Sequence, residues 1–286
     1  MYTRILVATG GSPWSHAALT YAITLAARMG AELRILTVLT LPASYRADKN
    51  ASSMNLVMGS IENAAQELLE EAADRALRAN VPYTTHYAWG PIPTTILQTA
   101  TEEACDLIVL GSRRVAGCQR RTLGRIANVV AAQAPQPVLI VKRPLVPQAL
   151  LGKRILVATG GSPWSEAAVN HALMLAQNQD FEVCLMHVER ESSQSDAESS
   201  HSEGKQLLAQ TEARAAAAGI AYAGVLDTGP IPNAILATAS REQCSAIIVG
   251  SRGVMGWKQP LLGHIASTVA ARADLPVLII KHFVSL

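Results

Sequence analysis

Short runs of β-branched and aliphatic residues alternate with longer, Ala- and Leu-rich stretches along the whole chain. In the first half the short runs cover residues 5–9, 32–39, 83–88, 107–110 and 138–141. The stretches between these runs have the apolar periodicity of helices. Strands that alternate with helices in this way are typical of a parallel sheet covered by helices. The pattern therefore predicts an α/β fold.

The same series of elements occurs twice. Residues 4–15 read RILVATGGSPWS, and the same twelve letters return 150 positions later. Three later landmarks recur 139 positions apart: GPIP at 90 and 229, GSR at 111 and 250, and PVLI at 137 and 276. The first copy thus carries 11 extra residues, which we place between about Leu41 and Glu62. This duplication predicts two domains, 1–143 and 152–286, joined by a linker that contains Pro144 and Pro147.

Each copy indicates where its first helix begins. Ser12 and Ser162 follow the first strand, and a proline comes directly after each of them. A serine hydroxyl can cap a helix, and proline is favoured at the first helical position. In a doubly wound five-stranded sheet of order 3-2-1-4-5, the ligand crevice lies between strands one and four. The segments after those strands, starting at Gly10 and Gly111 or at Gly160 and Gly250, would line it.

The second copy has a glycine pattern suited to phosphate. Gly250 and Gly253 follow its fourth strand, and Gly263 precedes an Ala-rich helical stretch. Glycines let the backbone approach a ligand with its N–H groups, and the helix that starts near His264 adds a partial positive charge. No Walker A or G-x-G-x-x-G sequence is present, which disfavours a P-loop NTPase or an ordinary dinucleotide dehydrogenase.

Together these motifs resemble the universal stress protein family, whose nucleotide-binding members carry a G-x2-G-x9-G-(S/T) loop after the fourth strand. The resemblance covers essentially the whole chain, twice: the opening strand, the GPIP segments, the GSR loops and the closing PVLI strands. It implies two doubly wound 3-2-1-4-5 domains of the adenine nucleotide alpha-hydrolase-like type, packed as a pseudo-dimer through their last strands. It also implies stress-related expression and, in some members, binding of ATP with Mg²⁺.

The departures from the family pattern favour the second copy. The Asp that nucleotide-binding relatives place after strand one is Gly10 here, and Gly160 in the second copy. The Ser or Thr after the last loop glycine is Arg125 or His264. In the first copy Arg114 also replaces the second loop glycine, where a side chain resists a positive φ. We therefore expect an adenine nucleotide chiefly in the second domain.

The candidate binding residues of the second domain are Thr159, Gly160, Gly161, Ser162, Val188, Gly250, Arg252, Gly253, Gly263 and His264. Their degenerate equivalents in the first domain are Gly10, Gly111, Arg113, Arg114, Gly124 and Arg125. His264 either hydrogen-bonds phosphate in place of the missing hydroxyl or only caps its helix. The sequence predicts no catalytic residue and no metal ligand.

Composition narrows the classes of partner. Hydrophobic residues make up 49% and charged residues 16%, so a buried core is expected, and a net charge of +2 gives no sign of nucleic acid or membrane binding. Four cysteines without zinc spacing, and no long apolar run, favour a cytoplasmic protein with reduced thiols. We interpret the Arg-rich segment 111–125 as a solvated surface loop rather than a phosphate clamp, and the Ser- and Glu-rich segment 189–205 as a loop.

Three hypotheses of function follow. The leading one is a ligand-responsive stress protein that binds ATP or a similar nucleotide and is at most a weak ATPase. The alternative is an interaction module with vestigial pockets that recruits protein partners, and a weaker one is an ATP-using enzyme with low turnover. No Ser/His/Asp set or carboxylate pair can be assembled from the motif positions, so binding is favoured over catalysis. Dimerisation of the tandem with a second copy is left open.

Overall fold

A computed structural model describes residues 2–42, 51–113, 122–142, 154–179, 181–189, 194–252 and 261–281. The first half of the chain forms β1 (Arg4–Ala8), α1 (Pro13–Met29), β2 (Glu32–Leu39), α2 (Ala51–Arg78), β3 (Tyr83–Trp89), α3 (Ile92–Glu102), β4 (Leu107–Gly111), α4 (Arg125–Gln133) and β5 (Val138–Val141). The second half forms β6 (Arg154–Thr159), α5 (Pro163–Gln179), β7 (Glu182–Glu189), α6 (Gln194–Ala217), β8 (Tyr222–Thr228), α7 (Ile231–Arg241), β9 (Ala246–Gly250), α8 (His264–Arg272) and β10 (Val277–Ile280).

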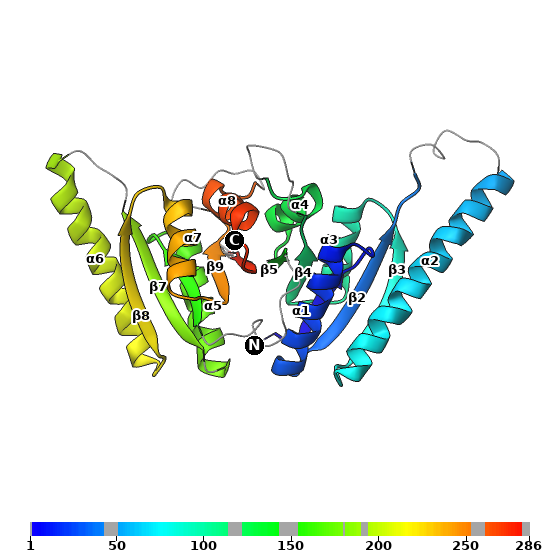
Figure 1. Cartoon of the computed structure of the whole chain (residues 1–286), viewed down its shortest axis with the longest axis horizontal. Helices are drawn as coiled ribbons and strands as arrows, with labels where there is room; N and C mark the ends of the chain where they lie inside the picture. Colours follow the sequence, from blue (N-terminus) through cyan, green and yellow to red (C-terminus); the bar gives the residue numbers. More distant parts are fainter. Residues whose placement is uncertain are drawn as a thin grey trace.

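All ten of these strands join one sheet, in the order β3-β2-β1-β4-β5-β10-β9-β6-β7-β8. Neighbouring strands within each half are parallel, so each half is a 3-2-1-4-5 sheet. The halves meet at an antiparallel pair, β5 and β10, in which Leu139 lies opposite Leu278. Figure 1 shows this pair at the centre and α2 and α6 at the two outer ends. The predicted tandem fold and its pseudo-dimeric packing are confirmed.

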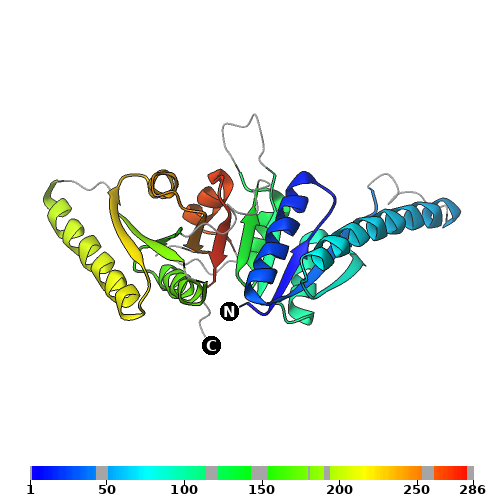
Figure 2. The ribbon, with the colours of Figure 1, turned by 60° about the horizontal axis from the view of Figure 1, so that its bottom comes forward.

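Helices cover both faces of the sheet because the strands bury side chains on both faces. Ile5 and Val7 belong to the core under α1 and α2, whereas Leu6 belongs to the core under α3 and α4. Each of these two cores continues across the β5–β10 junction into the second half. Figure 2 shows the same layers after a rotation of the molecule. Cys105, Cys184 and Cys244 are free thiols buried in the core.

The predicted start of the first helix is confirmed. Ser12 is the N-cap of α1, its hydroxyl accepts a hydrogen bond from Ser15 N, and Pro13 is the first helical residue. The helix ends at Gly30, which has a left-handed φ of 65° and donates its N–H to Ala26 O. This local sequence therefore fixes both ends of the helix that follows the first strand.

A lysine at the end of each half's last strand donates a hydrogen bond to the other half. Lys142, at the end of β5, donates to Ala273 O at the end of α8, with a distance of 3.3 Å. Lys281, after β10, donates to Ala131 O and Ala132 O at the end of α4. Each ammonium thus meets the partial negative charge at the C-terminus of the other half's last helix. Burial lowers the pKa of Lys281 to about 8.

The extra residues of the first copy lie where the sequence comparison puts them. Helix α2 has 28 residues and α6 has 24, so part of the insertion lengthens the helix and the rest precedes it. The interpretation of 189–205 as a loop is wrong for most of its length, because α6 begins at Gln194. Once Leu208 and Ala215 are buried against the sheet, extending the helix backwards costs little, since each added residue gains a backbone hydrogen bond.

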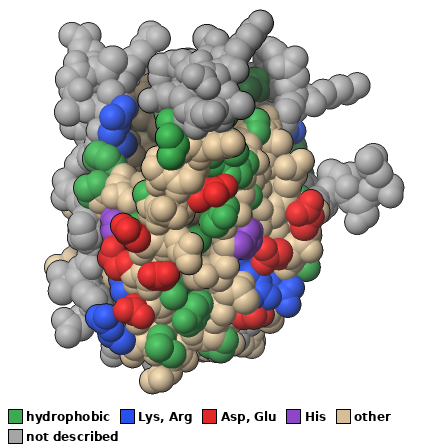
Figure 3. Space-filling model, turned by 90° about the vertical axis from the view of Figure 1, so that its right-hand side faces the viewer, with side chains coloured by type: hydrophobic (Ala, Val, Ile, Leu, Met, Phe, Trp, Pro, Cys, Tyr) green, Lys and Arg blue, Asp and Glu red, His purple; other side chains and the backbone are tan. Residues whose placement is uncertain are grey.

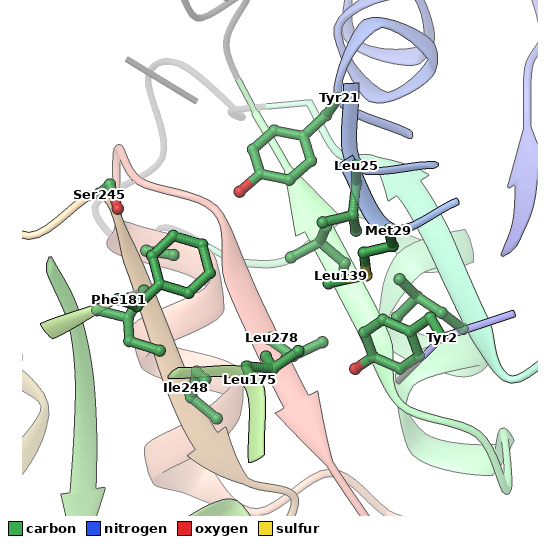
Figure 4. Close-up of a pocket in the computed structure, with 13 residues that line it drawn as sticks. Tyr2, Tyr21, Leu25, Met29, Leu139, Leu175, Phe181, Ser245, Ile248 and Leu278 are labelled. Carbon is green, nitrogen blue, oxygen red and sulfur yellow. The ribbon is translucent and has the colours of Figure 1, made fainter. Parts of the chain in front are cut away.

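An apolar cavity of about 50 Å³ lies between the two halves, lined by side chains of α1, α5 and the central strands (Figure 4). At its edge Tyr2 Oη lies 2.6 Å from His171 Nε2, which joins the first half to the second. Burial lowers the pKa of His171 from 6.5 to about 4. The unfolded chain therefore binds more protons than the folded chain between these two pH values.

This shift predicts an acid-sensitive contribution to stability. The contribution is fully present above pH 6.5 and is lost as the pH falls toward 4. Between about pH 7 and pH 4.5, the free energy of unfolding of the wild type should fall by roughly 2 kcal/mol more than that of His171→Phe. Urea denaturation of both proteins at the two pH values measures the difference. An equal fall in both would mean that His171 titrates normally.

Candidate functional site

In each half the strand order reverses between the first and fourth strands, so the candidate crevice lies beyond the ends of β1 and β4, or of β6 and β9. The segment after β6 is a tight turn in which Gly161 has a φ of 70°. Gly160 N donates to Ser165 Oγ at 3.2 Å, and Ser165 N donates to Ser162 Oγ at 3.2 Å. The first half has the same bonds around Gly10, Ser12 and Ser15. Each turn is thus held by its own hydrogen bonds.

Gly250 lies where two backbones approach closely. A Cβ atom at this position would lie 2.5 Å from Trp164 O, in the first turn of α5. At the equivalent Gly111 the corresponding distance, to Trp14 O, is 2.3 Å. The fold itself therefore requires glycine at the end of the fourth strand, independently of any ligand.

The N-terminus of α8 lies at the end of β9. Gly263 is its N-cap, with no side-chain cap among the described residues. The Gly263 N–H donates to Ser251 O at 2.8 Å, so this amide is engaged within the protein. Within the described part of this loop, the amides of the first turn of α8 are left as backbone donors for an anion at this end of the crevice. The start of α4 is similar, with Gly124 N donating to Ser112 Oγ at 3.3 Å.

Two predicted side chains lie at this end of the crevice. The guanidinium carbon of Arg252 is 5.9 Å from the ring centroid of Trp164, a cation–π contact that holds it beside the first turn of α5. His264 is the first residue of α8 and is exposed. A guanidinium and a helix N-terminus in this arrangement form an environment that favours negative charge.

The structure brings most of the second-domain candidates to one edge of the sheet. Thr159, Gly160, Gly161 and Ser162 follow or end β6, Gly250 and Arg252 end and follow β9, and Gly263 and His264 begin α8. Val188 belongs to β7 and is buried in the core under α7 and α8. In the first half Gly10, Gly111, Arg113, Gly124 and Arg125 occupy the equivalent places. Gly253 and Arg114 lie outside the described residues.

The floors of the two crevices differ in a way that was not predicted from the sequence. In the second half His187 Nδ1 lies 3.0 Å from Thr159 O, and Thr159 Oγ1 donates to Glu166 at 3.3 Å. The first half has Thr37 in place of His187 and an open cleft of about 550 Å³ beside it. Alignment of the two copies with an offset of 150 residues reveals that Thr37 corresponds to His187. It does not reveal that the smaller side chain leaves an open cleft.

The described residues offer neither a metal cluster nor a membrane-spanning helix. They contain no cluster of three or more His, Cys, Asp or Glu side chains placed to hold a metal ion. Their helices include none with the length and apolar character that a membrane span needs.

Comparisons with known proteins bear on both halves. The sequence profile of the Universal stress protein family matches residues 1–142 and 152–281. The universal stress protein YxiE of Bacillus subtilis (strain 168) is 32% identical over 153 residues, which cover 50% of this chain and all (100%) of that protein. A universal stress protein from Methanocaldococcus jannaschii is 29% identical over 144 residues, covering 50% of this chain and 84% of that protein.

A solved structure covers both domains together. The crystal structure of a universal stress protein from Archaeoglobus fulgidus DSM 4304 superposes with a TM-score of 0.78 at 24% identity, over 98% of this chain and 96% of that one. This likeness supports the tandem fold. Since the family profile matches nearly the whole chain in two consecutive copies, the chain belongs to the universal stress protein family and carries two domains of that family in tandem.

Proposed function

We propose that this chain is a stress-response protein that binds an adenine nucleotide, ATP or a close relative, in the crevice of its second domain. The observation that carries the proposal is the start of α8, which has no described side-chain cap and lies at the end of β9, next to β6. Nucleotide occupancy would then change how the protein meets its partners. The motif positions supply no nucleophile with a general base, so regulated binding is favoured over catalysis.

Each part of the second crevice has a role in this proposal. The first-turn amides of α8 and the guanidinium of Arg252 would hold phosphate oxygens, which suit backbone N–H groups and planar cations. His264 would donate to phosphate where relatives have a hydroxyl. The turn at Gly160 would receive the nucleoside, because a Cβ built there has no neighbouring atom within 4 Å. When bound with ATP, Mg²⁺ would offset phosphate charge.

A gain-of-function substitution tests this placement. Gly160→Asp restores the carboxylate that nucleotide-binding relatives carry after the first strand, and the space around Gly160 accepts it. A hydrogen bond to a charged group contributes about 1.5 kcal/mol, so affinity for ATP, ADP or AMP should rise about tenfold. Isothermal titration calorimetry of the full chain, with and without Mg²⁺, measures this change.

The matched control is Gly10→Asp, the same change at the equivalent open position of the first domain. It should leave nucleotide affinity within about twofold of the wild type, since the proposed site lies in the other half. If neither the wild type nor Gly160→Asp saturates at millimolar nucleotide, the second crevice is not a nucleotide site. The interaction-module hypothesis would then be favoured. Equal gains in both variants would contradict a preference for the second domain.

A further inference from the structure

Two lysines at the joint between the halves are withdrawn from solvent. Figure 3 shows the outer end of the first half, where acidic and basic side chains lie on the surface. At the central joint, by contrast, Lys142 is 4% exposed and Lys281 is partly buried. A buried ammonium is costly unless its surroundings compensate its charge. The contacts of Lys281 therefore show what this part of the molecule supplies to a positive charge.

On one side Lys281 contacts the first half through backbone carbonyl groups. Its ammonium donates to Ala131 O and, at 3.4 Å, to Ala132 O. Both carbonyls belong to the last turn of α4, where the helix dipole supplies partial negative charge. The segment 131–137, AAQAPQP, contains no acidic residue, whereas the equivalent segment of the second half includes Asp274. On this side the ammonium of Lys281 is therefore compensated by dipoles and not by a carboxylate.

On its other side Lys281 adjoins the phosphate end of the second crevice. Ser251 N donates to Ile280 O at 2.8 Å, and Arg252 and Lys281 directly follow this bond on the two neighbouring strands. Arg252 is held beside α5 by its contact with the Trp164 ring. Among the described residues, Arg252 is the charged group that acts on Lys281: burial first, and then this guanidinium, lower the pKa of Lys281 to about 8. Near pH 8 the amine is therefore half protonated.

Lys281 thus lies between two structures that belong to different halves. Arg252 is at the edge of the second crevice, whereas Ala131 and Ala132 end a helix that begins at the edge of the first crevice. A charged ammonium donates stronger hydrogen bonds than a neutral amine does. The protonation of Lys281 therefore affects how firmly the second half holds the end of α4.

An anion at the phosphate end changes the charge balance around Lys281. A phosphate that meets Arg252 offsets the repulsion between the two cations, and its own negative charge attracts the ammonium. The effect is reciprocal, because a ligand that favours the protonated lysine is itself bound more tightly when the lysine is protonated. A coupling of about fivefold lies at the low end of what linked sites in proteins show.

We propose that Lys281 couples phosphate binding in the second crevice to the joint between the halves. An anion beside Arg252 favours the charged ammonium of Lys281, and the ammonium in turn strengthens the hydrogen bonds to the end of α4. Nucleotide occupancy of one half is thereby transmitted to a helix of the other half. This inference rests on the function proposed above, because it concerns regulation of the same site.

The first arm of the test measures AMP affinity of the full chain by calorimetry at pH 7.5 and pH 9.5, where the phosphate monoester stays ionised. Wild-type affinity should fall about fourfold between these values, as Lys281 loses its proton. Lys281→Arg keeps its charge, so its affinity should match the wild type at pH 7.5 and stay constant. Lys281→Met should bind about fivefold more weakly at pH 7.5 and also show no fall.

The matched control is Lys142→Met, which removes the equivalent bond of the first half to Ala273 O. Lys142 lies at the end of β5, beside the first crevice, so this variant should keep the wild-type fall in AMP affinity with pH. Circular dichroism and the Tm of each variant verify folding. A fall of the same size in the wild type and in Lys281→Arg, with AMP bound by both, overturns the inference.

The second arm contains no nucleotide. The ¹³C chemical shift of Lys281 Cε, assigned by its loss in Lys281→Met, is followed against pH in the wild type and in Arg252→Gln. Removing the guanidinium should raise the midpoint by about half a pH unit, because one positive neighbour is gone. An unchanged midpoint overturns the inference. Absence of AMP binding in the first arm overturns the proposed function instead, while this titration still decides whether Lys281 responds to charge in the crevice.

Discussion

Gly250→Ala and Gly111→Ala should each lower the free energy of unfolding by about 3 kcal/mol. A Cβ at these positions would lie 2.5 Å and 2.3 Å from the carbonyl oxygens of Trp164 and Trp14. Those oxygens belong to the first turns of α5 and α1, whose caps fix them, so the neighbour cannot rotate away as a flexible side chain would. The helix must shift from the sheet, which strains the packing of the whole face. Urea denaturation followed by circular dichroism measures the loss.

The matched controls for these two glycines are Gly160→Ala and Gly10→Ala. They lie in the same turns, yet a Cβ at either has no neighbouring atom within 4 Å, and neither has a positive φ. Their free energies of unfolding should stay within about 0.5 kcal/mol of the wild type. Equal destabilisation at all four glycines would show that the close approach to the helix is not the reason for glycine at the end of the fourth strand.

Leu278→Asp should destabilise the chain by about 4 kcal/mol. Leu278 is 6% exposed, lies opposite Leu139 in the antiparallel β5–β10 pair, and belongs to the core that both halves share. A carboxylate there must be buried without a partner or must separate the two halves. Urea denaturation gives the change in free energy, and sedimentation velocity reports whether the particle becomes more extended.

The control is Leu56→Asp, the same exchange at a position of α2 that is 77% exposed. It should change the free energy of unfolding by less than about 0.5 kcal/mol. If Leu278→Asp unfolds at the same urea concentration as the wild type, the continuous ten-stranded sheet is contradicted. Two halves that do not pack through their last strands would tolerate a charge at this site.

The fold could be predicted from the sequence because its signals are local and occur twice. The first strand was expected over 5–9 and is Arg4–Ala8, and the Ser12 cap starts the helix as its hydroxyl and the following proline predict. Pairing of the two halves through their last strands was predicted from the family resemblance. The residue sequences of β5 and β10 do not themselves indicate which strand each of them pairs with. Only the first half of α6 was missed: residues 194–205 were interpreted as loop because they are polar, and their helical conformation depends on the packing of the second half of the helix against the sheet.

The site was less predictable, because its decisive features are distances between segments far apart in sequence. Gly250 was interpreted as a ligand-facing glycine, and only its approach to Trp164 O shows the packing requirement. Alignment of the two copies shows that Thr37 stands at the position of His187. Only the structure shows that the His187 side chain occupies the space beside Gly204, which explains why the second crevice is filled and the first is open. The pKa of His171 likewise depends on burial between the halves.

The most direct test of nucleotide binding in the second domain is photoaffinity labelling of the full chain with 2-azido-AMP, followed by peptide mass spectrometry. The account predicts labelled peptides from the ends of β6 and β9 and the start of α8, with labelling suppressed by unmodified AMP. If the labelling that unmodified AMP suppresses is found only on peptides of the first domain, nucleotide binding in the second domain is contradicted.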